Sequence, residues 1–172
     1  MSPKARLVAW VEQQGIRFVH HRLHTDYLNA VEEHELAEAP FTSGIAVDWT
    51  EATIHIDDSR GERPWPHLLH EAGHLLWEEN RNPDHWRDTD FFGWEFSVVK
   101  QLNLPMSQFY KSNTDYGISF RSPTTEKFYD VVAEIPLYSR AWRRMVQCFI
   151  EDGILHGFIT EDGLPNHRTI TD

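Results

Sequence analysis

Residues Pro66–Glu78 read PHLLHEAGHLLWE, and this stretch decides how the rest of the chain is interpreted. It contains the pattern His-Glu-x-x-His, with His70, Glu71 and His74 at the three defined positions. On an α-helix, residues four apart lie on the same face, one turn from each other. Both imidazoles can then reach one tetrahedral zinc ion, with Glu71 beside a metal-bound water. The stretch therefore predicts a helix that carries a zinc site.

The residues around the pattern support a helix with one apolar side. At about 100° per residue, a set of apolar side chains falls opposite His70. Pro66 suits the first turn, where its missing N–H costs nothing. The chain contains 11 histidines, so the pattern can also occur by chance. The alternative is then a surface helix whose histidines face water. The apolar set consists of Leu68, Leu69, Ala72, Leu75 and Leu76.

The composition is typical of one globular domain. The chain has 172 residues, 40% of them hydrophobic, which is enough to bury a core. Its single cysteine, Cys148, excludes an intramolecular disulfide and fits a reducing compartment. Apolar neighbours at helical spacing favour Cys148 as a buried small side chain over a nucleophile. With no secretory segment and no stretch near the ~20 apolar residues of a membrane span, we expect a cytoplasmic protein without a membrane partner.

The net charge argues against nucleic acid as a direct partner. The formal charge is −11 at pH 7. Nonspecific binding to nucleic acid depends on Lys and Arg side chains that neutralise phosphates. Direct nucleic-acid binding is therefore not expected.

Periodicity and turn residues predict an α+β fold with a small three-stranded sheet, an active-site helix and additional C-terminal helices. Before the motif we expect a helix ended by Gly15, strands at 16–20, 43–48 and 52–57, and a helix or irregular acidic segment at 26–39. After it we expect a polar connection at 80–90, a helix at 91–103, a long loop at 107–122, and helices at about 125–135 and 137–151, the second capped by Gly153. The predicted single domain 1–172 has a core at about 16–105, a helical extension at about 106–159 and a polar tail at 160–172.

Three histidines near the first predicted strand invite a second metal interpretation. They are His20, His21 and His24. Successive strand residues point to opposite faces, so His20 and His21 do not easily serve one site. Surface or core histidines are the favoured interpretation.

Glu95 occupies the middle of an apolar helical face. Five apolar residues lie within about 60° of it around the helix axis. A buried carboxylate is costly unless a cation or strong donors meet it, and zinc is one such cation. An arginine partner is the alternative. His85 and Asp90 are competing candidates for a third zinc ligand, but both lie in the polar connection, where water can solvate them.

These pieces together resemble a zincin metallopeptidase of the gluzincin type, and more narrowly the ImmA/IrrE family of small intracellular metallopeptidases. In that family a strand with an I-x-I core precedes the His-Glu-x-x-His helix, and a later helix supplies a glutamate and ends in an aliphatic-Pro pair. The corresponding pieces here are Ile54-His55-Ile56, the 70–74 motif, Glu95 and Leu102-Asn103-Leu104-Pro105.

The resemblance covers about residues 43–105. Phe96-Ser97-Val98-Val99 departs from the family's usual Ala- and Phe-containing run, so the subfamily and the substrate stay open. A metzincin is disfavoured because its required Gly and third His would fall at Trp77 and Asn80.

The resemblance implies a zinc-dependent endopeptidase that acts on a cytoplasmic protein, with a transcriptional repressor as the implied class of substrate. His70, His74 and Glu95 are the expected ligands of Zn²⁺, and Glu71 is the expected catalytic base. A donor for the developing oxyanion is also expected; the candidates are Tyr110, Tyr116 and His85. Two alternatives stay open: a non-catalytic zincin-fold regulatory or binding module, and a zinc hydrolase of a small molecule.

Overall fold

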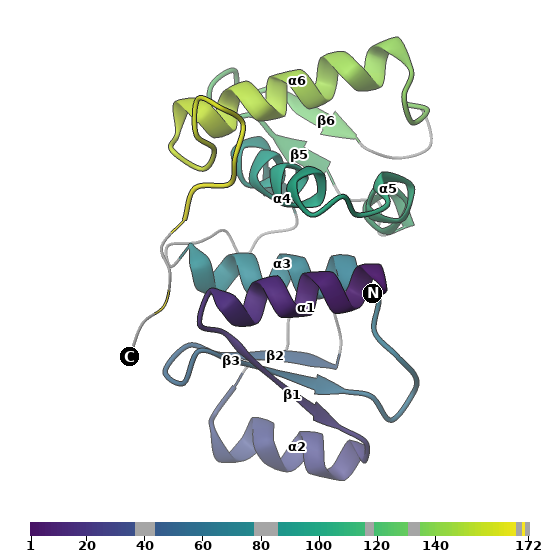
Figure 1. Cartoon of the computed structure of the whole chain (residues 1–172), viewed down its shortest axis with the longest axis vertical. Coiled ribbons are helices and arrows are strands. Elements are labelled where there is room, and N and C mark those ends of the chain that lie inside the picture. The colour runs from purple at the N-terminus through teal and green to yellow at the C-terminus, as the bar shows by residue number, and fades with distance from the viewer. Residues whose placement is uncertain (37–43, 78–85, 116–118, 131–134, 168–169, 171–172) are drawn as a thin grey trace. The chain divides into compact units, whose positions relative to one another are not determined.

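The computed structural model describes residues 1–36, 44–77, 86–115, 119–130, 135–167 and 170 (Figure 1). The chain forms two compact units: the first comprises residues 1–80 and 168–172, the second residues 81–167. Both units combine helices with strands, which confirms the α+β class. The single-domain prediction stays a prediction, because two compact units can belong to one domain. None of the helices within the described residues has the length and apolar character needed to cross a bilayer.

The first unit is built on the small three-stranded sheet that the sequence predicted. Its strand order is β1-β3-β2. β1 runs parallel to β3, whereas β2 and β3 form an antiparallel pair. The strands are β1 (Arg17–His21), β2 (Ile45–Asp48) and β3 (Thr53–Asp57).

Helices cover both faces of this sheet. α1 (Pro3–Gln13) and α3 (Trp65–Leu76) pack together on one side, and α2 (His24–Glu33) lies on the other (Figure 1). The hydroxyl of Ser2 accepts a hydrogen bond from the Ala5 amide and caps α1 as its sequence predicts. The predicted strands and the first helix are thus found, each within two residues of the expected bounds.

The two sides of the sheet differ in polarity because side chains alternate along each strand. The side toward α1 and α3 carries Ile45, Ile54 and Ile56, all fully buried. On the side toward α2, His21 and His55 come from adjacent parallel strands. A polar layer therefore lies between α2 and the sheet.

The second unit centres on α4 (Thr89–Gln101), which packs against α6 (Arg140–Leu155). Buried aromatic rings join these helices: Phe92 of α4 contacts Phe149 of α6 with ring centroids 5.0 Å apart. The unit also contains α5 (Met106–Asp115) and a second sheet in the order β4-β5-β6. Its strands are β4 (Trp86–Asp88), β5 (Ser119–Arg121) and β6 (Phe128–Asp130).

Several predictions for the second unit are wrong. The predicted helix 125–135 contains β6, and the predicted loop 107–122 contains most of α5 and all of β5. The predicted polar connection 80–90 contains β4 and the first residues of α4. Strands of three residues are too short for alternation to be recognised, and pairing with neighbours stabilises them.

Gly153 does not cap α6, contrary to expectation. The helix continues to Leu155, and Gly153 is buried within it. A Cβ at Gly153 would lie 2.5 Å from Cδ1 of Ile159, so this glycine allows the following segment to fold back onto the helix. The glycine is needed for close packing.

Candidate metal centre

The motif helix α3 begins at Trp65, directly after Pro64, and ends at Leu76. Pro66 lies in its first turn, where no intrahelical hydrogen bond is lost. The predicted apolar side is buried as expected. On the other side Glu71 is 2% exposed and His67 is 9% exposed. His70 and His74 are half-buried, so a surface helix whose histidines face water stays an alternative.

His70 and His74 converge on one point. Their Nε2 atoms lie 3.0 Å apart, and the two rings stand at 82° to each other. Two nitrogens bound to one tetrahedral zinc at 2.0–2.1 Å are about 3.3 Å apart. The two Nε2 atoms need to move apart only slightly to bind one zinc ion. The two imidazoles therefore fit the zinc site that their spacing predicts.

Glu71 lies between the two histidines in sequence, and its side chain is almost completely buried. A carboxylate held out of bulk water is suited to accept a proton from an attacking water. The motif thus provides two converging nitrogen donors, and the buried acid lies one residue after His70 on the same helix.

Glu95, the predicted third ligand, lies on α4 in the second unit and is completely buried. Its burial confirms the prediction from the helical pattern. His70 and His74 belong to the first unit. The role of Glu95 as a zinc ligand therefore stays a prediction from the sequence.

The competing candidates for the third ligand have different outcomes. Asp90 is not in a polar connection: it is the second residue of α4 and only 8% exposed. Its Oδ2 atom lies 3.3 Å from Nδ1 of His156, so a nearby side chain meets the acid. His85 lies outside the described residues.

The candidate oxyanion donors receive no support. Tyr110 lies in the second unit, and its hydroxyl donates a hydrogen bond to the Ile135 carbonyl. Burial raises the pKa of Tyr110 above its ordinary value. Tyr116, like His85, lies outside the described residues.

The single cysteine, Cys148, is half-buried, and its Sγ atom lies 3.4 Å from the hydroxyl oxygen of Tyr129.

The histidines of β1 point to opposite faces, as alternation predicts. His20 Nδ1 lies 2.8 Å from Asp58 Oδ2, whereas His21 Nε2 lies 3.0 Å from His55 Nδ1. His20 and His21 therefore do not share one site. His24, on α2, is paired with Asp57 at 2.7 Å.

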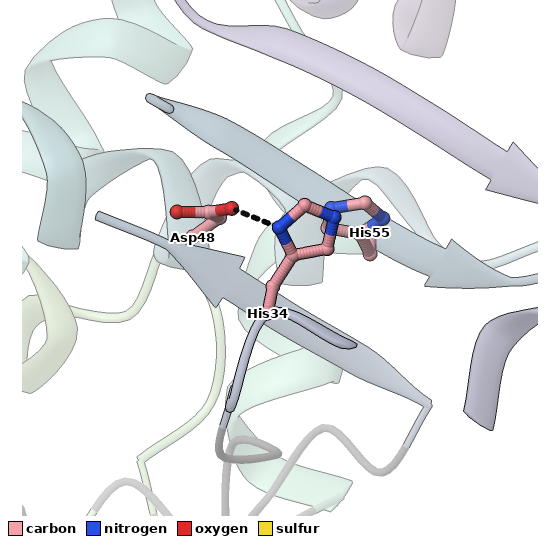
Figure 2. Close-up of side chains that lie close together, drawn as sticks. All are labelled: His34, Asp48 and His55. Atoms are coloured by element: carbon pink, nitrogen blue, oxygen red, sulfur yellow. Dashed lines mark ion pairs between the residues drawn. The ribbon is translucent and has the colours of Figure 1, made fainter. Parts of the chain in front are cut away.

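A second group of potential metal ligands was not predicted. Figure 2 shows His34, Asp48 and His55 close together, with potential ligand atoms all within 4.8 Å of one another. Asp48 and His55 are buried. Burial lowers the pKa of His55, and the neighbouring His21 and His34 lower it further. No spacing in the sequence reveals the group, because it depends on strand register and on where α2 ends.

No family model matches the chain, and no curated protein or solved structure is significantly similar to it.

Proposed function

We propose that the protein is a zinc-dependent endopeptidase that cleaves a peptide bond of a cytoplasmic protein. The observation that carries the proposal is the 3.0 Å separation between Nε2 of His70 and Nε2 of His74. Two imidazole nitrogens that converge on one helix face, with a buried glutamate between them in sequence, form the donor set of HExxH zinc hydrolases.

Zinc bound to this pair supplies Lewis acidity toward the scissile carbonyl and lowers the pKa of a coordinated water. His70 and His74 hold the ion through Nε2, and Glu95 is the proposed third ligand. The carboxylate of Glu71 accepts the proton of the attacking water and then transfers it to the nitrogen of the leaving amine. Glu71 is buried, which supports its role as the base.

The proposed substrate is a transcriptional regulator inside the cell. This part of the proposal is supported by the resemblance to ImmA/IrrE metallopeptidases across the I-x-I strand, the motif helix and the Leu-Pro pair after Glu95. The lone cysteine agrees with a reducing compartment.

The proposal is tested by incubating the zinc-loaded protein with a cytoplasmic extract and identifying new peptide termini by mass spectrometry. Glu71→Gln is the control, because it removes the base and keeps the size and shape of the side chain. We expect termini that appear with the parent protein and not with Glu71→Gln. The same termini from both proteins would reject the mechanism, and no termini from either would favour a binding module.

A further inference from the structure

The layer between α2 and its face of the first sheet is unusually rich in histidine and aspartate. A helix normally covers a sheet with apolar side chains. Here His55 and Asp57 of β3 share one face, and His24 and His34 meet this face from α2 and its C-terminal end. The polar groups in this layer need partners, because burial of an unmatched polar group is costly.

Two histidine–aspartate pairs in this layer have different geometries. Nδ1 of His24 lies 2.7 Å from Oδ2 of Asp57, which is the length of a charge-assisted hydrogen bond. Nδ1 of His34 lies 3.5 Å from Oδ2 of Asp48, which is too long for such a bond. Two ligand atoms on one tetrahedral zinc are about 3.4 Å apart. The second pair therefore has the spacing of two metal ligands.

The carboxylate of Asp48 is held in a defined orientation. Its Oδ1 atom accepts hydrogen bonds from the backbone amides of Thr50 and Glu51 at 3.0 and 3.1 Å. The turn between β2 and β3 thereby leaves Oδ2 on the side of His34. A ligand oriented before binding loses little side-chain entropy when a cation arrives.

His55 is held in a comparable way. Its ring lies beside those of His21 and His34, with centroids 5.3 and 5.6 Å away and interplanar angles of 14° and 30°. Nδ1 of His55 lies 3.0 Å from Nε2 of His21. When His55 donates its Nδ1–H to His21, its Nε2 carries a lone pair. Histidines that bind metals usually donate their other ring N–H in this manner, so His21 is a positioning residue.

We propose that His34, Asp48 and His55 bind a second divalent transition-metal ion, with zinc as the expected occupant. Two imidazoles and one carboxylate are the donor set of an open zinc site. The side chain of His34 is 40% exposed, so its ring can rotate to bring the ligand atoms, now within 4.8 Å of one another, to bonding distance. The ion would tie the C-terminal end of α2 to strands β2 and β3.

This site is separate from the motif pair, because α2 and α3 cover opposite faces of the first sheet (Figure 1). It does not depend on the proposed peptidase activity. Binding here would stabilise the first unit whether or not the motif binds zinc.

The test is a competition titration of the metal-free protein with Zn²⁺ against a chromophoric chelator. Parent protein should bind two zinc ions. In His34→Ala the affinity of the second site should fall at least tenfold, so that this variant binds one zinc ion. His20→Ala is the matched control, since His20 also faces an aspartate and its side chain is 42% exposed, against 40% for His34. His20→Ala should bind as the parent does.

Two further variants keep the outcome decisive. Asp48→Asn retains the oxygen that accepts from the turn amides and should weaken the second site as His34→Ala does. His70→Ala with His74→Ala removes the motif pair and should leave one zinc ion, which His34→Ala then removes. Unchanged zinc stoichiometry and affinity in both His34→Ala and Asp48→Asn would overturn the proposal. Loss of zinc only from the motif variant would leave the peptidase proposal standing alone.

Discussion

Gly93 of α4 lies directly against the backbone of Phe149 in α6. A Cβ atom at Gly93 would be 2.3 Å from the carbonyl oxygen of Phe149 and 2.9 Å from its carbonyl carbon. Glycine is a poor helix former, so its place in the middle of α4 has a packing reason. The missing side chain allows the two central helices of the second unit to approach closely.

Gly93→Ala should therefore destabilise the protein although alanine favours helices. The added methyl group meets backbone, which cannot rotate away, and overpacking of this kind costs about 1–3 kcal/mol. Chemical denaturation measures the effect. Lys100→Ala, at an exposed position of the same helix, is the control and should change stability little. Equal stability of Gly93→Ala and parent would show that the two helices can move apart at no cost.

His74→Ala should remove one equivalent of bound zinc. The variant loses one of two converging nitrogen ligands, and a single imidazole holds zinc weakly. Elemental analysis after dialysis measures the zinc content. His67→Ala tests whether any histidine on α3 has the same effect, and it should retain the parent's zinc. Failure of parent protein to bind zinc at the motif after reconstitution would contradict the metal centre.

Glu71→Gln should keep the metal and the fold while it abolishes cleavage. The base acts on the attacking water and is not itself a ligand, so its neutral isostere leaves the zinc site intact. Zinc content and thermal stability should match those of the parent, and peptide cleavage should fall by at least 100-fold, the lower end of about 10²–10⁴ for a general base. A variant that cleaves normally would assign the base to another residue.

Glu95→Ala should lower zinc affinity at least tenfold, because loss of a ligand is a larger effect than loss of a residue that only orients one. His85→Ala should leave the affinity within about threefold of the parent value. Zinc-competition titrations of both variants, each compared with the parent, distinguish the candidates. A stronger effect from His85→Ala would move the third ligand to His85 and remove the main support for a gluzincin arrangement.

The free energy of unfolding should decrease as the pH is lowered from 6.5 to 4, because His167 becomes protonated in the unfolded chain first. Burial lowers the pKa of His167 from 6.5 to about 4, and its Nδ1 lies 3.1 Å from the indole Nε1 of Trp94, which donates to it. In the unfolded chain His167 binds a proton below pH 6.5, whereas in the folded chain it does so only below about pH 4. The neutral ring therefore stabilises the fold fully above pH 6.5, and this stabilisation is lost as the pH falls to 4. The loss is about 2 kcal/mol once partial exposure of the ring is considered.

His167→Gln isolates this contribution, because glutamine can accept the hydrogen bond from Trp94 and does not titrate. Denaturation curves at several pH values should show a steeper decline for the parent than for the variant between pH 6.5 and 4. Parallel declines would mean that other groups, chiefly carboxylates, account for the whole acid sensitivity.

The part of the site that could be predicted from the sequence is local. Helical periodicity placed Leu68, Leu69 and Leu76 on the buried side of α3, and it brought His70 and His74 onto one face. The same periodicity predicted that Glu95 would be buried. These features depend only on the turn of one helix, and the positions of residues three or four apart follow from that geometry.

Other features were decided by tertiary structure. Asp90 is buried at the start of α4, where the sequence suggested a solvated connection, and β4, β5 and β6 form only because each pairs with a neighbour. His34, Asp48 and His55 come from the end of one helix and from two strands, so their meeting depends on the register of β2 and β3 and on α2 lying across them. Contacts between residues far apart in the chain depend on which faces bury together, and a one-residue change in register would turn each side chain to the other face.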